Sequence, residues 1–231
     1  MPTELREDVW WLDLSGVNAY VVDDGGTVTL VDAGPVWDAD AVLDGVVEAG
    51  YALADLDRVL VTHYDLDHVG GLSRLGGLDV TVYAGAGDAP LVAGTASPDL
   101  SSRKGLLQLL GSPLVGTPPD DVRSLADGDE VGSFTVYETP GHTPGHVAYV
   151  SESLGVAFVG DLVREANGEL EASPWLLSDD TEAVERSIRT LADRMPDVTV
   201  LVPGHGVPFN EGGTDRLDDL ATQLWAPPVR T

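Results

Sequence analysis

The sequence contains no cysteine among its 231 residues. This absence excludes a disulfide framework, a thiolate metal site and a cysteine nucleophile. No apolar run approaches the ~18 residues that a membrane span needs, and the acidic start lacks the basic and apolar regions of a signal peptide. We therefore expect a cytoplasmic protein without a membrane partner.

Basic residues are also scarce. The chain has 12 lysines and arginines, with Lys104 as its single lysine, against 39 acidic residues, and the net charge is −27. The acids are spread along the whole chain, which favours adaptation to a high-salt cytosol over the alternative, a cationic partner. An extended basic footprint is missing, and this argues against a nucleic-acid partner.

The pattern of apolar residues predicts alternating strands and helices. Runs rich in β-branched residues predict strands over residues 9–14, 17–22, 27–32, 58–62, 80–83, 134–138, 146–150, 156–159 and 198–202. Helical spacing predicts helices around 42–47, 103–110, 179–195 and 214–225. The third helix is expected to begin near Ser178 or Asp179, with Glu182 placed for a capping box.

No linker or repeat divides the sequence, so we expect one domain over residues 1–231 with helices on the outside of its sheets. Residues 85–125 differ in composition, because glycine, alanine, proline and serine dominate there. We interpret them as an inserted segment that covers a pocket.

Histidines and carboxylates follow the predicted strands. Four of the five histidines end an apolar strand or lie beside a carboxylate, and strand ends of a layered fold meet at one edge. The densest stretch is His63-Tyr64-Asp65-Leu66-Asp67-His68. If it is extended, residues 63, 65 and 67 project the same way and a turn adds His68. These four side chains could hold one metal ion or two.

Five ordered motifs resemble those of the metallo-β-lactamase-fold hydrolases, over about residues 15 to 210. The motifs are Leu30-Val31-Asp32-Ala33-Gly34, Thr62 to Gly71 (THYDLDHVGG), Thr139 to His146 (TPGHTPGH), Phe158-Val159-Gly160-Asp161 and Val202-Pro203-Gly204-His205-Gly206. The resemblance implies an α+β fold, a four-layer αβ/βα sandwich. It also implies two divalent metal ions at one edge, with zinc the first choice and iron or manganese as alternatives.

The resemblance assigns a role to each ligand. It places His63, Asp65 and His142 on the first metal, places Asp67, His68 and His205 on the second, and makes Asp161 the bridge between them. We assign Asp67 and Asp161 as the catalytic carboxylates and a metal-bound water or hydroxide as the nucleophile. Asp32 would orient the ligands from behind. His146 matches no ligand position and is interpreted as a residue that supports the site.

Asp65 departs from the family, most of which has histidine at this position. The extra carboxylate should weaken Lewis acidity, raise the pKa of bound water and favour iron or manganese relative to zinc. Alternatively, Asp65 points away from the site and leaves a single-metal enzyme.

The substrate is less defined by the sequence. We expect a hydrolase that acts on an ester, thioester, lactone or similar small-molecule bond. The alternatives are a phosphodiesterase or nuclease of the same fold, and a flavodiiron- or dioxygenase-like non-heme iron redox protein. Arg103, Lys104 or Arg164 could attract an anionic substrate group, although the sequence favours a surface salt bridge for these residues. Trp37 could supply an apolar wall.

Overall fold

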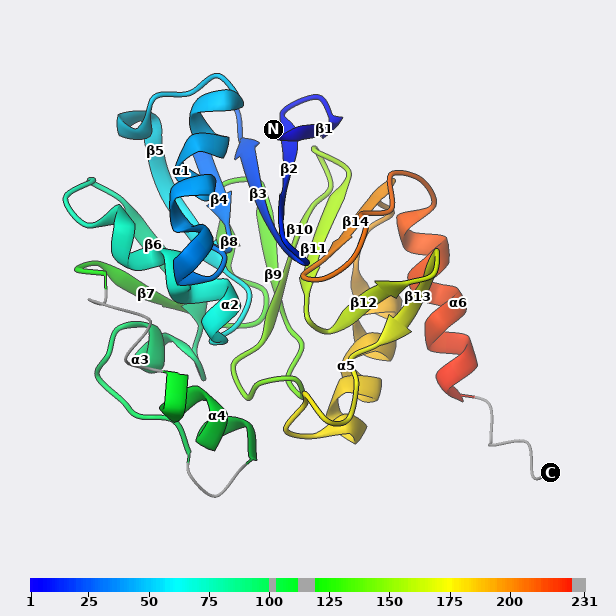
Figure 1. Ribbon diagram of the computed structural model, residues 1–231. Helices are drawn as coiled ribbons and strands as arrows, with labels where there is room; N and C mark the ends of the chain where they lie inside the picture. Colours follow the sequence, from blue (N-terminus) through cyan, green and yellow to red (C-terminus); the bar gives the residue numbers. More distant parts are fainter. Residues whose placement is uncertain (100–102, 112–118, 226–231) are drawn as a thin grey trace.

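Two β-sheets stacked face to face form the centre of the molecule (Figure 1). The computed structural model describes residues 1–99, 103–111 and 119–225. Within these residues, the first sheet has seven strands in sequence order, antiparallel from β1 to β4 and parallel from β4 to β7. They are β1 (Thr3–Arg6), β2 (Val9–Leu14), β3 (Val17–Asp23), β4 (Val28–Val31), β5 (Leu56–Val61), β6 (Thr81–Gly85) and β7 (Val122–Leu125).

The second sheet has the strand order β14-β11-β10-β9-β8. Its strands are β8 (Glu130–Val131), β9 (Phe134–Glu138), β10 (Val147–Ser151), β11 (Val156–Gly160) and β14 (Val200–Pro203). β8 to β11 are antiparallel neighbours, and β14 joins β11 in parallel. A separate antiparallel hairpin consists of β12 (Val163–Ala166) and β13 (Glu169–Ala172).

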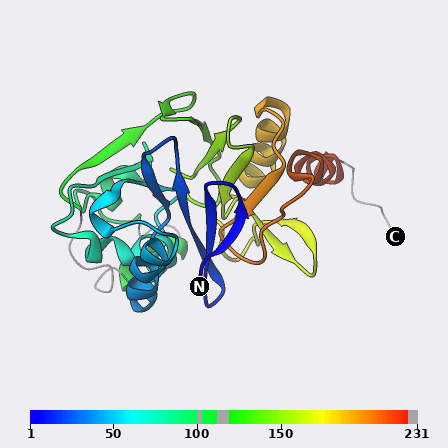
Figure 2. The same ribbon diagram turned by 90° about the horizontal axis from the view of Figure 1, so that it is seen from above.

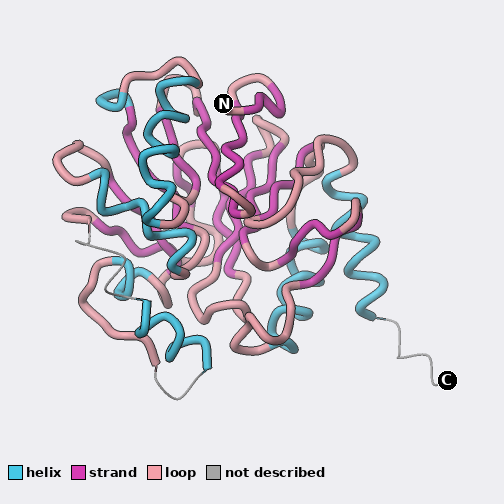
Figure 3. The backbone as a smooth tube through the Cα atoms, viewed as in Figure 1, coloured by secondary structure: helices cyan, strands magenta, loops and turns pink. Residues whose placement is uncertain are grey.

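Helices cover the outer faces of both sheets (Figures 2 and 3). The helices are α1 (Ala39–Glu48), α2 (Leu66–Val69), α3 (Ala89–Val92), α4 (Arg103–Gly111), α5 (Thr181–Arg194) and α6 (Gly213–Trp225), with 3-10 turns at Val36–Asp38, Leu53–Asp55 and Gly70–Leu75. α1 packs into the outer core of the first sheet, and α5 and α6 pack into that of the second. Within the described residues, no helix is both long and apolar enough to cross a membrane.

Alternation along the strands accounts for this layering. On β10, Tyr149 faces the core between the sheets, whereas its neighbours Ala148 and Val150 face α5 and α6. Between the sheets, the rings of Tyr20 and Phe158 meet edge to face with centroids 5.3 Å apart. The order helix–sheet–sheet–helix confirms the predicted α+β fold with four layers.

Strand direction brings the motif residues to one edge. β4 and β5 are parallel, so the residues that follow them, Asp32 and His63, leave the first sheet on the same side. β9 and β11 each run antiparallel to β10, and β14 is parallel to β11. His142, Asp161 and His205 therefore follow three strands that end together.

Local details differ from the sequence-based expectations. Residues 66–69 form a helical turn, α2, so the expected extended loop is wrong beyond Asp65. α5 begins after Asp180, slightly later than expected. The Asp180 side chain accepts a hydrogen bond from the Ala183 N–H at 2.9 Å, so the expected capping box through Glu182 is wrong. The segment 85–125 contains α3 and α4 but ends in β7, which is the edge strand of the first sheet.

Candidate metal centre

Two groups of side chains at the shared strand edge could each hold a metal ion. Within each group, the candidate ligand atoms lie within 4.8 Å of one another. The first group is His63, Asp65, His142 and Asp161, and the second group is Asp67, His68 and His205. The turn at α2 causes this division, because Asp65 precedes the helix whereas Asp67 and His68 lie on it.

The first group is compact and mostly buried. The His142 Nε2 atom lies 3.0 Å from Asp65 Oδ2 and 3.4 Å from Asp161 Oδ2. The His63 Nε2 atom lies 3.4 Å from Asp65 Oδ2. Zinc holds nitrogen and oxygen ligands at ~2.0–2.2 Å, so tetrahedral ligand atoms lie roughly 3.4 Å apart, a spacing close to the one found here.

The second group lies nearer to solvent and shares Asp161 with the first. His205 Nε2 is 3.2 Å from Asp161 Oδ2 and 3.5 Å from Asp67 Oδ2, and His68 Nε2 is 3.4 Å from Asp161 Oδ1. The two oxygens of Asp161 thus face both groups. Gly204 permits this arrangement, because a Cβ there would collide with Asp161 Oδ1.

Asp32 and Thr62 orient two of the imidazoles. Asp32 Oδ2 accepts hydrogen bonds from the Thr62 hydroxyl at 2.8 Å and from His68 Nδ1 at 2.9 Å. Since the Thr62 hydroxyl donates to Asp32, its oxygen accepts from His63 Nδ1 at 2.9 Å. Both rings therefore donate from Nδ1 and direct Nε2 into the site.

The other two imidazoles also have a hydrogen-bond partner at Nδ1. His205 Nδ1 donates to the Gly16 carbonyl oxygen at 2.7 Å. His142 Nδ1 lies 2.9 Å from Ser173 Oγ, which accepts a hydrogen bond from Ser178 Oγ at 3.1 Å. All four Nε2 atoms consequently face the space between the two groups.

Neighbouring charges shift the pKa values of His68 and Asp161. Burial alone would lower the pKa of His68, but Asp161 and Asp32 raise it well above its usual value. Burial likewise opposes ionisation of Asp161, yet His68 and His205 hold its pKa well below the usual range. A metal ion would take the place of the His68 proton, so binding there releases a proton and strengthens as pH rises.

His146 lies behind the centre and outside both groups. Its Nδ1 is 2.8 Å from Thr139 Oγ1, and its ring centroid is 5.1 Å from that of His63. Burial, followed by His63, lowers its pKa well below the usual value. His146 is thus a buried neutral ring, and a Cβ on Gly160 would approach its Nε2 to 2.8 Å.

The donor set fits divalent metal ions. Among the described residues, His63 Nε2, His68 Nε2 and Asp161 Oδ1 are buried without any hydrogen-bond partner. Buried polar atoms are normally satisfied, so three unsatisfied atoms that face one space are typical of a site that binds an ion. Imidazole and carboxylate are the ligands that zinc and iron share.

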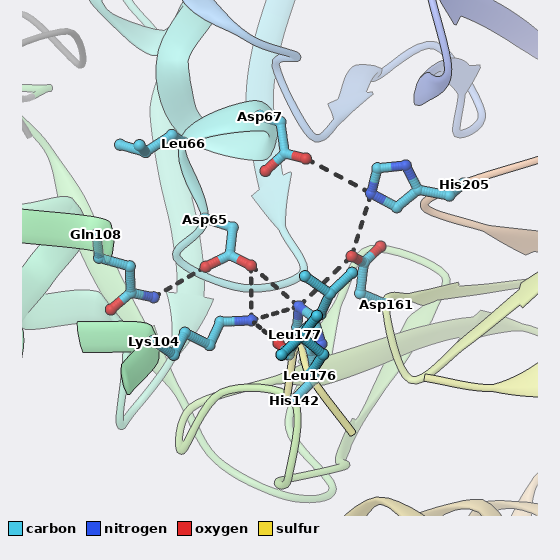
Figure 4. A pocket seen from close by; sticks show the side chains of 10 residues that line it. All are labelled: Asp65, Leu66, Asp67, Lys104, Gln108, His142, Asp161, Leu176, Leu177 and His205. Atoms are coloured by element: carbon cyan, nitrogen blue, oxygen red, sulfur yellow. Dashed lines mark hydrogen bonds and ion pairs between the residues drawn. The ribbon is translucent and has the colours of Figure 1, made fainter. Parts of the chain in front are cut away.

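A cavity of about 240 Å³ opens onto this centre (Figure 4). Its lining combines ligands with residues of α2, α4 and the loop before α5: Asp65, Leu66, Asp67, Lys104, Gln108, His142, Asp161, Leu176, Leu177 and His205. Sequence reasoning missed Gln108 and the three leucines. Gln108 follows Lys104 by four residues on the predicted helix, and this spacing was the available signal.

The predicted substrate residues lie in different parts of the structure. Lys104 lines the cavity and is buried. In the described part of the cavity lining, Trp37 and Arg164 do not occur. Trp37 is 70% exposed, and Arg164 donates to Glu171 across the β12–β13 hairpin at 2.8 Å. The side chain of Arg103 lies outside the described residues.

Sequence reasoning also missed Asp88, a buried carboxylate after β6. It accepts hydrogen bonds from the Tyr64 N–H at 2.7 Å, the Thr143 hydroxyl at 2.7 Å and the Gly145 N–H at 2.9 Å. Asp88 therefore ties the loop that carries His63 to the loop that carries His142.

The chain is similar in sequence to a known protein family and to several curated proteins. The family model of the metallo-beta-lactamase superfamily matches residues 12–205. A Bacillus subtilis protein named probable metallo-hydrolase YflN is 28% identical over 96% of this chain and 92% of its own length. A hydroxyacylglutathione hydrolase of Methylobacterium nodulans is 36% identical over 73% of this chain and 54% of its own length.

Solved structures show the same architecture. A metallo-beta-lactamase family protein of Thermus thermophilus has a TM-score of 0.69 and 25% identity, covering 95% of this chain and 80% of that one. BJP-1, a subclass B3 metallo-beta-lactamase of Bradyrhizobium japonicum, has a TM-score of 0.68 over 96% of this chain and 90% of that one. At 20% identity, the latter is a likeness of fold alone.

Proposed function

The chain belongs to the metallo-beta-lactamase superfamily as a hydrolase, and we propose that it cleaves an ester, thioester or lactone bond of a small molecule with two zinc ions. One observation carries the proposal. Two ligand groups lie on either side of Asp161 and border a cavity, and hydrogen bonds from behind orient the Nε2 atoms of His63 and His68.

The residues divide between two ions. His63, Asp65 and His142 would hold the first ion, Asp67, His68 and His205 would hold the second, and Asp161 would bridge them. Bound divalent ions would supply a water of lowered pKa and a Lewis acid for the scissile carbonyl group. Asp67 and Asp161 would be the carboxylates closest to the reacting atoms.

The cavity lining supports a small acyl substrate. Leu66 lines one part of the cavity, and Leu176 and Leu177 line another while remaining 62% and 52% exposed. Apolar walls above polar ligands suit a substrate with an apolar portion and a reactive carbonyl. The name of the hydroxyacylglutathione hydrolases supports the thioester among the bonds to be tested.

We also infer a cytosol of high salt. Within the part of the chain that the structure describes, carboxylates crowd one another near α6. Burial, and then the neighbours Asp215 and Asp197, raise the pKa of Asp218. Salt would relieve such repulsion between like charges.

The test combines metal analysis with an activity panel of lactones, thioesters and phosphodiesters in ~2 M KCl, where screening is strong. We expect zinc, and turnover of an acyl substrate. Phosphodiester turnover would favour the nuclease alternative, and two irons with oxygen-dependent turnover would favour the redox alternative.

Variants of the ligands complete this test. His142→Ala and His205→Ala should each reduce metal content and activity together, whereas His146→Ala should retain most of the metal. Full metal occupancy in the His142→Ala/His205→Ala double variant would refute the assignment of the centre.

A further inference from the structure

We propose that Lys104 acts as an internal cation of the first group, so that the two metal sites fill in sequence and the second group fills first. This proposal rests on the metal centre of the proposed function but not on the substrate. It makes Lys104 a residue that controls metal occupancy rather than one that binds an anionic substrate.

The position of the Lys104 ammonium group carries the inference. Its Nζ lies 2.7 Å from Asp65 Oδ2, 2.5 Å from His142 Nε2 and 2.9 Å from the Leu177 carbonyl oxygen (Figure 4). An ammonium group has three N–H donors, and three acceptors converge on it here. Lys104 is only 7% exposed, although lysines normally extend into water.

Two of these acceptors are the atoms that would bind the first metal ion. The ammonium group lies against the lone pair of His142 Nε2 and against Asp65 Oδ2, which faces the same space. A metal ion in the first group must therefore displace Lys104, or give up two of its ligands. Displacement breaks charge-assisted hydrogen bonds and brings two positive charges together, and both effects weaken binding.

In the second group, an entering ion competes with a proton on His68 but, among the described residues, not with a lysine or arginine side chain. In residues 1–99, 103–111 and 119–225, the ion pairs of Asp67 involve His205 and neither lysine nor arginine. His68 Nε2 and Asp161 Oδ1 are buried without a hydrogen-bond partner. An ion that enters there releases the His68 proton to solvent but moves no buried side chain out of the site, so the second group should fill at lower metal concentration.

Charge balance connects Lys104 with the departure at residue 65. Aspartate in place of the usual histidine adds one negative charge to the first group, and the Lys104 ammonium group, 2.7 Å away, offsets it. The aspartate and the lysine thus form one unit: the carboxylate supplies a hard ligand, and the ammonium group holds it while the metal ion is absent.

Gln108 provides a matched control on the same helix face. It lies one turn after Lys104 on α4 and donates from Nε2 to Asp65 Oδ1 at 2.9 Å and to the Tyr64 carbonyl oxygen at 2.5 Å. It contacts the same carboxylate as Lys104 but carries no charge.

The test is a titration of metal-free protein with Co²⁺, monitored by calorimetry and by the absorbance of the bound ion. In the wild type we expect two equivalents of Co²⁺ to bind in two separate steps. Lys104→Met should tighten the second equivalent about tenfold or more, the size expected for one charge-assisted hydrogen bond, and leave the first nearly unchanged. Gln108→Leu should not tighten either equivalent.

Two results would overturn the proposal. One is an unchanged or weaker second equivalent in Lys104→Met, and another is equal tightening in both variants, which would mean that loosening α4 is sufficient. A protein that takes up both ions as expected but hydrolyses no substrate would refute the proposed function and leave the role of Lys104 intact.

A second measurement does not need a variant, because Lys104 is the only lysine. In reductive methylation, the exposed N-terminal amine of Met1 serves as an internal reference. Lys104 should be protected in metal-free and one-equivalent protein and become reactive when the second equivalent binds. Reaction of Lys104 as fast as that of the N-terminus in metal-free protein would contradict the buried ion pair.

Discussion

Asp32→Asn should weaken metal binding in the second group while the backbone stays in place. Asp32 is buried and accepts three hydrogen bonds, from the Thr62 N–H, the Thr62 hydroxyl and His68 Nδ1. Its φ of 56° lies in the left-handed region, which asparagine tolerates better than most residues. The substitution therefore changes the donors and acceptors with little change in shape.

The magnitude follows from which oxygen is lost. With the asparagine carbonyl kept opposite the Thr62 N–H, its amide NH₂ replaces Oδ2 and faces the Thr62 hydroxyl and His68 Nδ1. The hydroxyl can rotate and accept, but the Nδ1–H of His68 cannot. Loss of this charge-assisted bond should cost metal-free protein ~1.5–3 kcal/mol. Loss of the hydrogen bond that orients the imidazole should weaken binding of the metal ion by about 10–100-fold.

The assay is Co²⁺ binding together with urea unfolding of metal-free protein. Asp13→Asn is the control, because Asp13 is an exposed carboxylate on β2 and its replacement removes the same charge. Wild-type affinity for both metal equivalents in Asp32→Asn would show that the carboxylate does not set the orientation of His68.

Three further predictions concern charge. Asp65→His should shift the acidic limb of the pH–rate profile to lower pH and favour zinc, and an unchanged profile would mean that Asp65 is not a ligand. Burial opposes ionisation of Asp24, but Ser133 and Arg58 lower its pKa overall. Its contribution to stability is therefore complete above the unfolded pKa of ~3.9 and disappears as pH falls through the lower folded pKa. Asp24→Asn should cost ~3 kcal/mol near pH 7, because Arg58 would lose its partner, and urea unfolding should show this loss shrinking below pH ~4. The melting temperature of metal-loaded protein should rise between ~0.1 and ~2 M KCl, as the screening length falls from ~10 Å to below ~3 Å. A flat curve would contradict the high-salt interpretation.

The positions of the ligands were predictable because they depend on strand ends. A buried strand must leave its sheet at a defined edge, and parallel neighbours leave on the same side. His63 and His205 each follow a short apolar run, so the sequence shows where each polar side chain emerges. The confirmed fold and the predicted ligand positions thus depend on the same feature of the chain.

The residues that contact the metal ligands from outside the two groups were not predictable, because their own partners are remote in sequence. Asp88 accepts hydrogen bonds from residues 24, 55 and 57 positions away. Its local sequence, Gly-Ala-Gly-Asp, indicates only a turn. Burial of Lys104 is similarly non-local, since one of its acceptors, Leu177, lies 73 residues away.

The β12–β13 hairpin shows a local signal that was overlooked. Asn167-Gly168 connects the two strands, with φ values of 55° and 86°. This dipeptide favours the two-residue turn whose twist matches antiparallel strands. The turn pairs Arg164 with Glu171 across the hairpin. Arg164 is thereby directed to a neighbouring strand, which explains why proximity to Asp161 in sequence does not bring it into the cavity.

The acidic charge of the whole chain makes the position of its single lysine informative. With 39 acidic residues, any basic side chain can find a carboxylate at the surface, and at that task lysine and arginine are nearly equivalent. Around Lys104 they are not equivalent. Three acceptors converge on one nitrogen, and an ammonium group is a compact charge with three donors, whereas a guanidinium group is a planar fork. The geometry of this site, in addition to its charge, therefore favours lysine at residue 104.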